Sequence, residues 1–328
     1  MINKNRLARL YGICQTSVVR LFNKANGLLK ARKYLDTQVL FFPEYPTGSN
    51  YAVWKIISYC GIRMRPLSRI HLEELSDNVM HRAWLKLFGV NSAENRTIIY
   101  AFEDNTTSIV DVKDYIKNCE RLPKGKKYYF INASCEDISK QSVSKWMTEV
   151  FGYATEVDPE TYTEVMVRKS DTNGIHDGEE VQAPIGKDSV DPNSVYQKLI
   201  DTSVDANYVQ DLRLVVIGDS IPVLYRKQRS ITERFSNTNT TVYLENPHDY
   251  FSQEELENIV RFRQVSGLDV CELDVLRDND NKKIYIVDVN RTISGPPNHI
   301  TLLDSLKAIA LMGNAFEKEY LESKKHFH

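Results

Sequence analysis

The feature that most constrains the fold is a pair of strand-like runs that each carry an acidic residue among apolar neighbours. The first run reads LDVCELDVL (268–276) and contains Asp274. The second reads IYIVDVN (284–290) and contains Asp288. The residues between them, RDNDNKK, are of the types that favour a turn, so the pattern predicts an antiparallel β-hairpin.

The predicted hairpin brings the two carboxylates together. In a register with Leu276 opposite Ile286, Asp274 lies directly opposite Asp288, and Asn290 shares the face of Asp288 because side chains alternate along a strand. Like charges that face each other across strands destabilise a sheet. An Mg²⁺ ion bound by carboxylate and amide oxygens would offset that repulsion. A solvated sheet edge is the alternative interpretation of the same segment.

Composition narrows the class of protein. The 328 residues are 42% hydrophobic and 26% charged, which is typical of a globular chain long enough for two or three structural units. The net charge of −2 gives no basic balance that would predict a nucleic-acid partner. Five cysteines without a CxxC pair indicate reduced thiols and a cytoplasmic location. No run approaches the roughly 18 apolar residues that a membrane span needs.

Residues 1–35 differ from the rest of the chain. They contain eight Lys or Arg residues and no acidic residue before Asp36. Apolar side chains recur there at helical spacing: Leu7, Leu10, Cys14, Val18, Leu21 and Phe22. A basic amphipathic helix can lie on an anionic membrane, which would make the protein membrane-peripheral. It can equally pack against its own domain.

Two further regions follow. Over residues 36–130, short apolar runs alternate with helix-like stretches, which predicts an α/β domain with a mostly parallel sheet. Residues 131–328 are rich in hairpins and predict an α+β domain. We divide this domain into a subdomain over about 135–200 and a second over about 201–328. The predicted fold class is therefore α/β and α+β.

A strand followed by a glycine-containing loop predicts a phosphate contact. Residues 165–178 read VMVRKSDTNGIHDG, with Lys169 at the end of the strand and Gly174 and Gly178 in the loop. Glycines let backbone amides approach a phosphate, and the lysine supplies charge. The sequence contains no Walker A or GxGxxG motif. A plain hairpin turn is the alternative.

A second predicted hairpin, DLRLVVIGDSIPVLYRKQR, carries a cluster of cations. Arg213 lies on its first strand, and Arg226, Lys227 and Arg229 lie near the end of its second. Such cations can form an exposed stripe, or they can stabilise the charge of a phosphoryl group during transfer.

In this order, the segments resemble the ATP-grasp superfamily over residues 130–300. EDISKQSVSKWMTEVFGY resembles its lysine-bearing helix, VYQKLID resembles the hinge beside adenine, and ELDVL and VDVN resemble its metal-binding strands. The nucleotide contacts that this implies are Lys140, Lys169, Ser170, Gly174, Gly178, Gln197, Lys198 and Leu199. The implied metal ligands are Asp274, Asp288 and Asn290, and the implied catalytic arginines are Arg226, Arg229 and Arg213. Residues 36–130 resemble the domain that precedes the ATP-grasp fold in outline.

Two departures from the superfamily pattern concern the acids. Asp288 stands where glutamate is usual, and Glu272 stands near the position at which some ligases of the superfamily have an arginine. The first bears on whether one or two metal ions are held. The second bears on the acceptor chemistry.

The resemblance implies a carboxylate–amine ligase that uses ATP and Mg²⁺, with Mn²⁺ as the alternative metal. Its partners would be a small-molecule carboxylate and an amine, and a homo-oligomer is compatible with the sequence. Two alternatives stay open: a kinase that phosphorylates a small-molecule or sugar hydroxyl, and a non-catalytic nucleotide-binding module. Ser49 or Asn50 in PEYPTGSNYAVW could cap a helix whose amides bind the acceptor.

Overall fold

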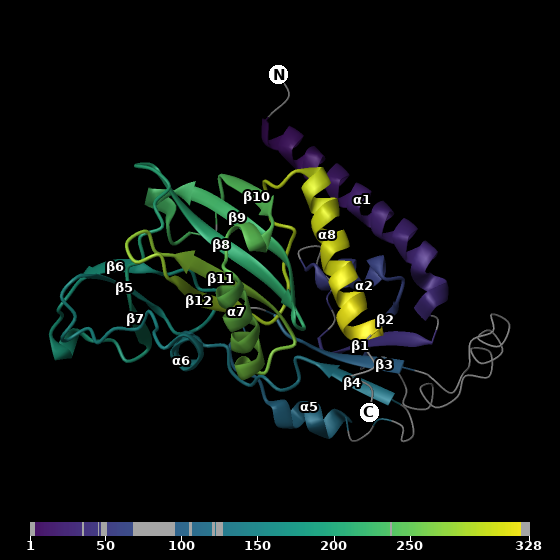
Figure 1. The fold of residues 1–328 in the computed structure, drawn as a ribbon, viewed down its shortest axis with the longest axis horizontal. Helices are drawn as coiled ribbons and strands as arrows, with labels where there is room; N and C mark the ends of the chain where they lie inside the picture. The colour runs from purple at the N-terminus through teal and green to yellow at the C-terminus, as the bar shows by residue number, and fades with distance from the viewer. Residues whose placement is uncertain are drawn as a thin grey trace. The chain divides into compact units, whose positions relative to one another are not determined.

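The computed structural model describes residues 4–34, 36–44, 46, 51–67, 96–104, 107–119, 122, 127–236 and 238–322. The chain divides into two compact units. Unit 1 comprises Met1–Glu103, Lys113–Ala133 and Ile293–His328, and unit 2 comprises Asp104–Val112 and Ser134–Thr292 (Figure 1).

Unit 1 is built on a parallel sheet. Its strands are β1 (Thr37–Pro43), β2 (Arg63–Pro66), β3 (Arg96–Phe102) and β4 (Lys127–Ile131), in the order β2-β1-β3-β4. Every neighbouring pair is parallel. Consecutive buried residues on β1 and β3 agree with a sheet that is covered on both faces. The predicted parallel sheet is therefore confirmed.

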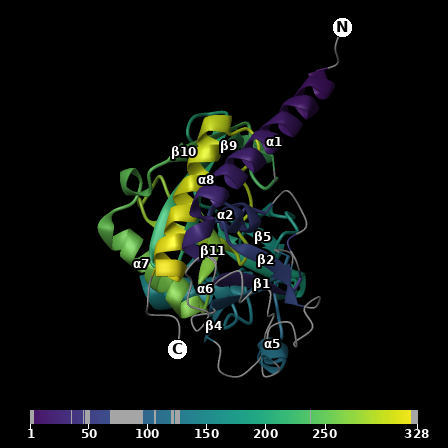
Figure 2. The ribbon, with the colours of Figure 1, turned by 90° about the vertical axis from the view of Figure 1, so that its right-hand side faces the viewer.

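The helices of unit 1 come from both ends of the chain. They are α1 (Lys4–Lys30), α2 (Val53–Tyr59), α5 (Val112–Cys119) and α8 (Leu302–Phe316), with the short segments η1 (Ala31–Tyr34) and η7 (Glu317–Glu322). Helices α1, α2 and α8 pack side by side (Figure 2). The Nζ atom of Lys30 lies 2.5 Å from a carboxylate oxygen of Glu317, which fixes the end of α1 to the end of α8.

The position of α8 differs from the sequence-based expectation. The sequence pattern predicts residues 293–328 as part of the C-terminal α+β domain, whereas the structure places them in unit 1. The physical reason is the close packing of α8 on α2. Gly313 leaves room for the ring of Tyr59, because a Cβ atom at Gly313 would lie 2.3 Å from Cδ1 of that ring.

Unit 2 contains two antiparallel sheets and two long helices. The five-stranded sheet has the order β10-β9-β8-β11-β12, and the three-stranded sheet has the order β6-β5-β7. The strands are β5 (Val165–Ser170), β6 (Glu179–Gln182), β7 (Ser194–Lys198), β8 (Tyr208–Ile217), β9 (Ser220–Ser230), β10 (Thr241–Glu245), β11 (Val270–Arg277) and β12 (Ile284–Asn290). The helices are α6 (Lys140–Phe151) and α7 (Gln253–Ser266), with short turns at Lys187–Ser189, Ile231–Glu233 and Pro247–Asp249. The predicted mixed fold class is confirmed.

Helices α6 and α7 cover one face of the five-stranded sheet. Phe262 of α7 and Val143 of α6 pack with Leu214 and Leu273 in one buried cluster. Because successive side chains of a strand point to opposite faces, the positions between these apolar residues point to the other face of the sheet. The face away from the helices therefore carries Asp211 and Arg213 of β8, Lys227 and Arg229 of β9, and Glu272 and Asp274 of β11.

The hairpin of β11 and β12 has the predicted pairing at its acids and a different one beyond them. Asp274 pairs with Asp288, which confirms the prediction. Leu276 pairs with Tyr285 and not with Ile286, because the register shifts by one residue directly after Asp274. The extra residue, Val287, makes a β-bulge.

We expect the substitution Gly313→Ala to lower the free energy of unfolding by about 1–3 kcal/mol, because the added methyl group would overlap the ring of Tyr59. Urea unfolding measures the change. The control is Gly186→Ala, where a Cβ atom meets nothing within 4 Å and φ is −66°, and it should change stability by less than about 0.5 kcal/mol. Equal effects of the two substitutions would contradict the packing described here.

Candidate functional site

A cavity of about 150 Å³ in unit 2 gathers most of the charged residues that the sequence analysis singles out. Five cations and four carboxylates line it. They come from α6, the end of β5, the loop that follows β5, and strands β8, β9, β11 and β12. The charged lining residues are Lys140, Lys169, Arg213, Lys227, Arg229, Asp177, Asp211, Asp274 and Asp288.

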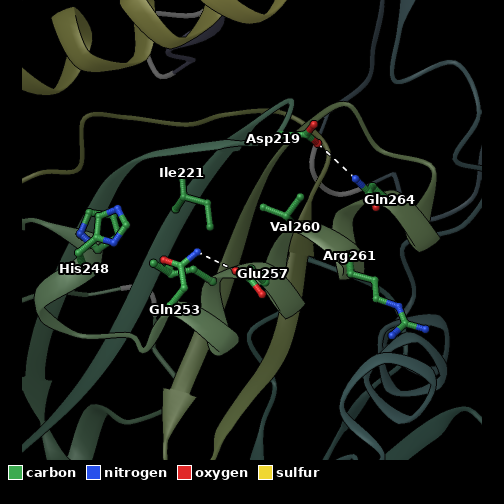
Figure 3. A pocket seen from close by; sticks show the side chains of 10 residues that line it. Asp219, Ile221, His248, Gln253, Glu257, Val260, Arg261 and Gln264 are labelled. Carbon is green, nitrogen blue, oxygen red and sulfur yellow. Dashed lines mark hydrogen bonds between the residues drawn. The ribbon is translucent and has the colours of Figure 1, made fainter.

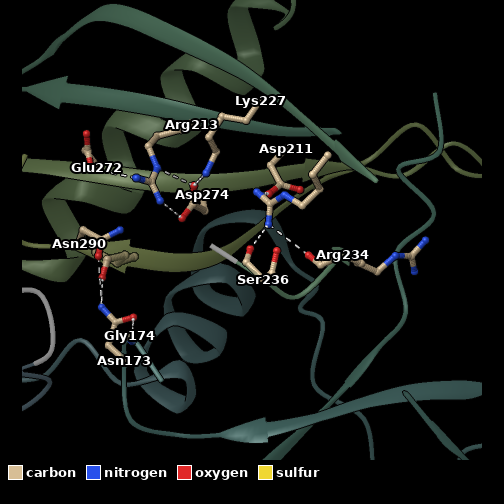
Figure 4. A network of polar contacts seen from close by, with 12 residues as sticks. Asn173, Gly174, Asp211, Arg213, Lys227, Arg234, Ser236, Glu272, Asp274 and Asn290 are labelled. Carbon is tan, nitrogen blue, oxygen red and sulfur yellow. Dashed lines mark hydrogen bonds and ion pairs between the residues drawn. The ribbon is translucent and has the colours of Figure 1, made fainter. Parts of the chain in front are cut away.

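The floor of the cavity is one row of side chains across the sheet. Asp288 of β12 pairs with Asp274 of β11, and Asp274 pairs with Arg213 of β8. Arg213 binds Asp274 through two hydrogen bonds, Nε to Oδ1 at 2.9 Å and Nη2 to Oδ2 at 2.7 Å (Figure 4). Lys227 of β9 donates from Nζ to the same Oδ1 at 3.1 Å. The repulsion expected between the two aspartates is thus offset at Asp274 by two cations.

The two aspartates have opposite electrostatic environments. Burial opposes the charge of Asp274, but Arg213 and Lys227 outweigh it and hold the pKa of this carboxyl well below its usual range. Burial raises the pKa of Asp288, Lys140 lowers it, and the charge of Asp274 raises it further. Among the described residues, Oδ1 of Asp288 is buried without a hydrogen-bond partner.

The donors that a magnesium ion needs are present in part. Asp288 offers its unpaired oxygen, and the amide oxygen of Asn290 lies at the end of the same strand. Asp274 would have to share its oxygens with Arg213 and Lys227. Within the described ranges, no group of three or more His, Cys, Asp or Glu side chains has the arrangement of a metal centre. The residues fit an ion held mainly by Asp288 and Asn290.

Two lysines face these acids from the other side of the cavity. Lys140 is the first residue of α6, directly after the N-cap Ser139, and its Nζ donates to the carbonyl of Thr172 at 2.7 Å. Burial lowers the pKa of Lys140, and the charges of Asp288 and Asp171 partly restore it. Burial also lowers the pKa of Lys169, at the end of β5, to about 8. Both ammonium groups are therefore short of compensating negative charge.

The loop after β5 is fixed at both ends. Asn173 is buried, and its Nδ2 donates to the carbonyl of Val289 at 3.0 Å and to Oδ1 of Asn290 at 3.5 Å. Gly174 follows with φ at 74°, a conformation that favours glycine. Gly178 lies against the ring of Phe235, and a Cβ atom there would approach Cδ1 of that ring to 2.8 Å. Both glycines, predicted as phosphate contacts, line the cavity.

The arginines divide between the two faces of the sheet. Arg213 and Arg229 line the cavity, and Arg229 binds Asp211 and the carbonyls of residues 234 and 236. Arg226 does not line it: its guanidinium binds Glu245 at 2.8 Å and lies over the ring of Tyr243. The expectation of a catalytic Arg226 is therefore wrong, because neighbouring positions on a strand point to opposite faces.

Lys227 lines the cavity, although it was predicted only as one of a cluster of cations and not among the implied catalytic residues. Tyr225 pairs with Arg213, so positions 225, 227 and 229 of β9 share the face of Arg213. Counting that alternation from Arg213 would have selected Lys227 and excluded Arg226. The same alternation places Asp211, which pairs with Lys227 across the strands, on the face of Arg213.

The remaining predicted nucleotide contacts lie outside the cavity. Gln197 is buried on β7 opposite Val167, and Lys198 donates to the hydroxyl of Tyr285 at 2.5 Å. Of the described residues that line the cavity, none comes from 197–199. Ser170 donates its hydroxyl to Asp177 at 2.5 Å. Ser49 and Asn50 lie outside the described residues.

A larger cavity of about 510 Å³ lies between α7 and the start of β9 (Figure 3). Its polar side chains are engaged with one another: Gln253 donates to Glu257 at 2.9 Å, and Gln264 donates to Asp219 at 3.3 Å. The full charges among its lining residues are Asp219, Glu257 and Arg261, against five cations and four carboxylates in the smaller cavity. The smaller cavity is therefore the candidate active site.

No protein-family model matches the chain, and no curated protein matches it. Solved structures do match it over most of its length. The ATP-grasp ligase PsnB, complexed with minimal precursor, Mg and ADP, has 13% identity and a TM-score of 0.46, covering 85% of this chain and 99% of that chain. D-alanine–D-alanine ligase from Bacillus anthracis, complexed with ATP, has 13% identity and a TM-score of 0.44, covering 86% and 96%.

A third similar structure is the RiPP-associated ligase from Chryseobacterium gregarium, in complex with ADP and a leader and core peptide. It has 11% identity and a TM-score of 0.45, covering 88% of this chain and 97% of that chain. PsnB and the Chryseobacterium gregarium protein are ATP-grasp ligases, and the Bacillus anthracis protein is a ligase complexed with ATP.

We expect Asp288→Asn to stabilise the protein without ligands at pH 8 but hardly at pH 4. Burial raises the pKa of Asp288, so the folded state holds the proton more tightly than the unfolded state. The stability that this proton contributes to the folded protein is therefore lost as pH rises through the raised pKa. The amide has no charge to bury. Urea unfolding at both pH values measures the difference.

The control for this prediction is Asp249→Asn at an exposed carboxylate, which should leave stability nearly unchanged at both pH values. A variant Asp288→Asn that is less stable than the original protein at pH 8 would contradict the electrostatics given for Asp288.

Proposed function

We propose that this chain is a Mg-ATP-dependent ligase of the ATP-grasp kind, which activates a substrate carboxylate as an acyl phosphate for attack by an amine. The observation that carries the proposal is the cavity in unit 2. There Lys140, Lys169 and a glycine-containing loop face a row of Asp288, Asp274 and Arg213. Such a site combines anion-binding groups with oxygen ligands for a cation.

In this proposal the lysines and the loop bind the polyphosphate. Lys140 and Lys169 carry charge in a buried setting that lowers the pKa of both, so a nearby phosphate would compensate each of them. Backbone amides near Gly174 can approach the phosphate closely, because no side chain intervenes. The cavity is too small to hold the adenine together with the phosphates. Residues 197–199, which lie outside the cavity, therefore remain the proposed contacts of the adenine.

Asp288 and Asn290 would hold Mg²⁺, which supplies charge neutralisation at the phosphate oxygens when it is bound. Their support is the unpaired, buried oxygen of Asp288. Asp274 acts differently: it positions Arg213 and Lys227 through the hydrogen bonds described above.

Arg213, Lys227 and Arg229 then form the cationic side of the cavity. A carboxylate oxygen of the substrate attacks the γ-phosphorus, the bond to the β-phosphate oxygen breaks, and ADP leaves. The amine next attacks the acyl carbon, phosphate leaves, and the amine loses its proton. Three fixed cations stabilise the charge on the transferred group in both steps, and positioning does most of the work in such reactions.

The proposed partners are a small-molecule carboxylate and an amine. A kinase acting on a hydroxyl would use the same nucleotide and metal groups, and it is the second candidate because none of the described cavity residues is specific for a carboxylate. The buried, unpaired thiols Cys60, Cys135 and Cys271 favour a reducing compartment, and we propose the cytoplasm.

We expect ATP hydrolysis to depend on an added carboxylate, and hydroxylamine to trap the acyl phosphate as a hydroxamate when no amine is present. A panel of acids, amines and sugars assayed for ADP release and hydroxamate provides the measurement. A phosphorylated alcohol without hydroxamate would replace the ligase with the kinase. Failure of Mg-ATP to bind, measured by calorimetry, would defeat both.

Matched variants locate the chemistry. Lys169→Ala should lower kcat/KM by at least about 100-fold, because it removes a positive charge that stabilises the transferred phosphoryl group. Arg226→Ala, one position from Lys227 but on the other face of the sheet, should stay within about threefold of the original value. Similar losses in the two variants would contradict the assignment of the faces.

We also expect ATP binding at pH 8.5 to take up about half a proton or more, because Lys169 has a pKa of about 8 and is mostly neutral there until a phosphate favours its charged form. Calorimetry in two buffers of different ionisation enthalpy counts the protons. Lys169→Arg keeps the charge but not the titration, so the uptake should vanish while binding remains. Unchanged uptake in that variant would assign the proton to another group.

A further inference from the structure

Helix α1 uses one face for packing within unit 1. Val19 and Asn23 are buried, and the ring of Phe22 lies 6.0 Å from the ring of Tyr59. At Gly27 the helix approaches α2 so closely that a Cβ atom would lie 2.4 Å from the carbonyl oxygen of Ser58. These contacts bury the inner face of α1 against unit 1 (Figure 2).

A second face of α1 is apolar and exposed. Val18, Leu21, Leu28 and Leu29 have exposed fractions of 41%, 71%, 78% and 82%. The step of three residues from Val18 to Leu21 and of seven residues from Leu21 to Leu28 sets these side chains on one side of the helix, and Leu29 lies at the edge of the same side. Together, these four residues form the outer face of α1. Large apolar side chains gathered on an exposed helix face mark an interaction surface.

The charge of residues 1–35 indicates which kind of partner fits the outer face of α1. Residues 1–35 contain eight Lys or Arg residues and no acid. Arg20 and Lys24 are exposed on α1. Lys30 and Lys33 bind Glu317 and so belong to the packing of α1 on α8. The outer face is thus flanked by positive charge without a compensating carboxylate on the same helix.

We propose that the outer face of α1 docks this protein on an anionic lipid surface, as a peripheral contact. Leucine side chains would enter the boundary between headgroups and acyl chains, and Arg20 and Lys24 would contact lipid phosphates. A second copy of the chain fits less well, because pairing two such helices would bring their cations together. None of the described helices combines the length and apolar character needed to cross a membrane.

Vesicle flotation with the full-length protein tests this proposal and does not depend on the proposed ATP chemistry. We expect binding to vesicles of equal parts phosphatidylcholine and phosphatidylglycerol, little binding to phosphatidylcholine alone, and release as NaCl rises from about 0.1 to 0.5 M. Leu21→Ser combined with Leu28→Ser should lower the lipid partition at least about tenfold. Lys24→Glu should lower binding to the anionic vesicles.

Two control variants match these changes elsewhere on the surface. Ile109→Ser with Val204→Ser removes two exposed apolar side chains of unit 2, and Lys187→Glu makes the same change of net charge. Both should bind the vesicles like the original protein. Equal losses in the controls, or absence of binding to anionic vesicles, would overturn the proposal. A dimer in sedimentation that Leu21→Ser with Leu28→Ser abolishes, without vesicle binding, would assign the outer face to a second copy instead.

Discussion

The bidentate pair of Arg213 and Asp274 is the interaction on which the arrangement of unit 2 depends. It joins β8 to β11 at the centre of the five-stranded sheet, and Lys227 extends it to β9. A partly buried carboxylate of this kind is tolerable because its hydrogen bonds are charge-assisted. Breaking such a pair from one side leaves an uncompensated charge, so the three strands are held in one relative register.

The β-bulge after Asp274 brings Val287 into the lining of the cavity beside Asp288. In a regular strand Val287 and Asp288 would point to opposite faces. The extra residue in β12 lets both line the cavity. Asp288 itself reaches the cavity through its regular pairing with Asp274, and the irregularity adds an apolar side chain beside it.

Local pattern was enough to predict much of this fold. The parallel sheet of unit 1 and the hairpin that pairs Asp274 with Asp288 both follow from periodicity and turn chemistry. The lysine and both glycines of the cavity followed from a strand and loop that are adjacent in sequence.

The rest depends on relations that a single sequence does not display. A bulge of one residue does not change the apolar appearance of the β12 sequence, so the pairing beyond Asp274 could not be predicted from that sequence. Choosing Arg226 over Lys227 ignored which face of β9 meets β8, although the alternation was available. The packing of α8 on α2 rests on the fit of Gly313 to Tyr59, residues more than 250 positions apart, which no local window contains.

The return of residues 293–328 to unit 1 has a consequence for biosynthesis. Unit 2 consists almost entirely of one continuous stretch, so its sheets can close while later residues are still being made. Unit 1 needs segments from both ends of the chain, and α1 and α2 must wait on the ribosome for α8. During that interval the apolar surfaces that α8 will cover are open, which makes the nascent first half the part most dependent on chaperones.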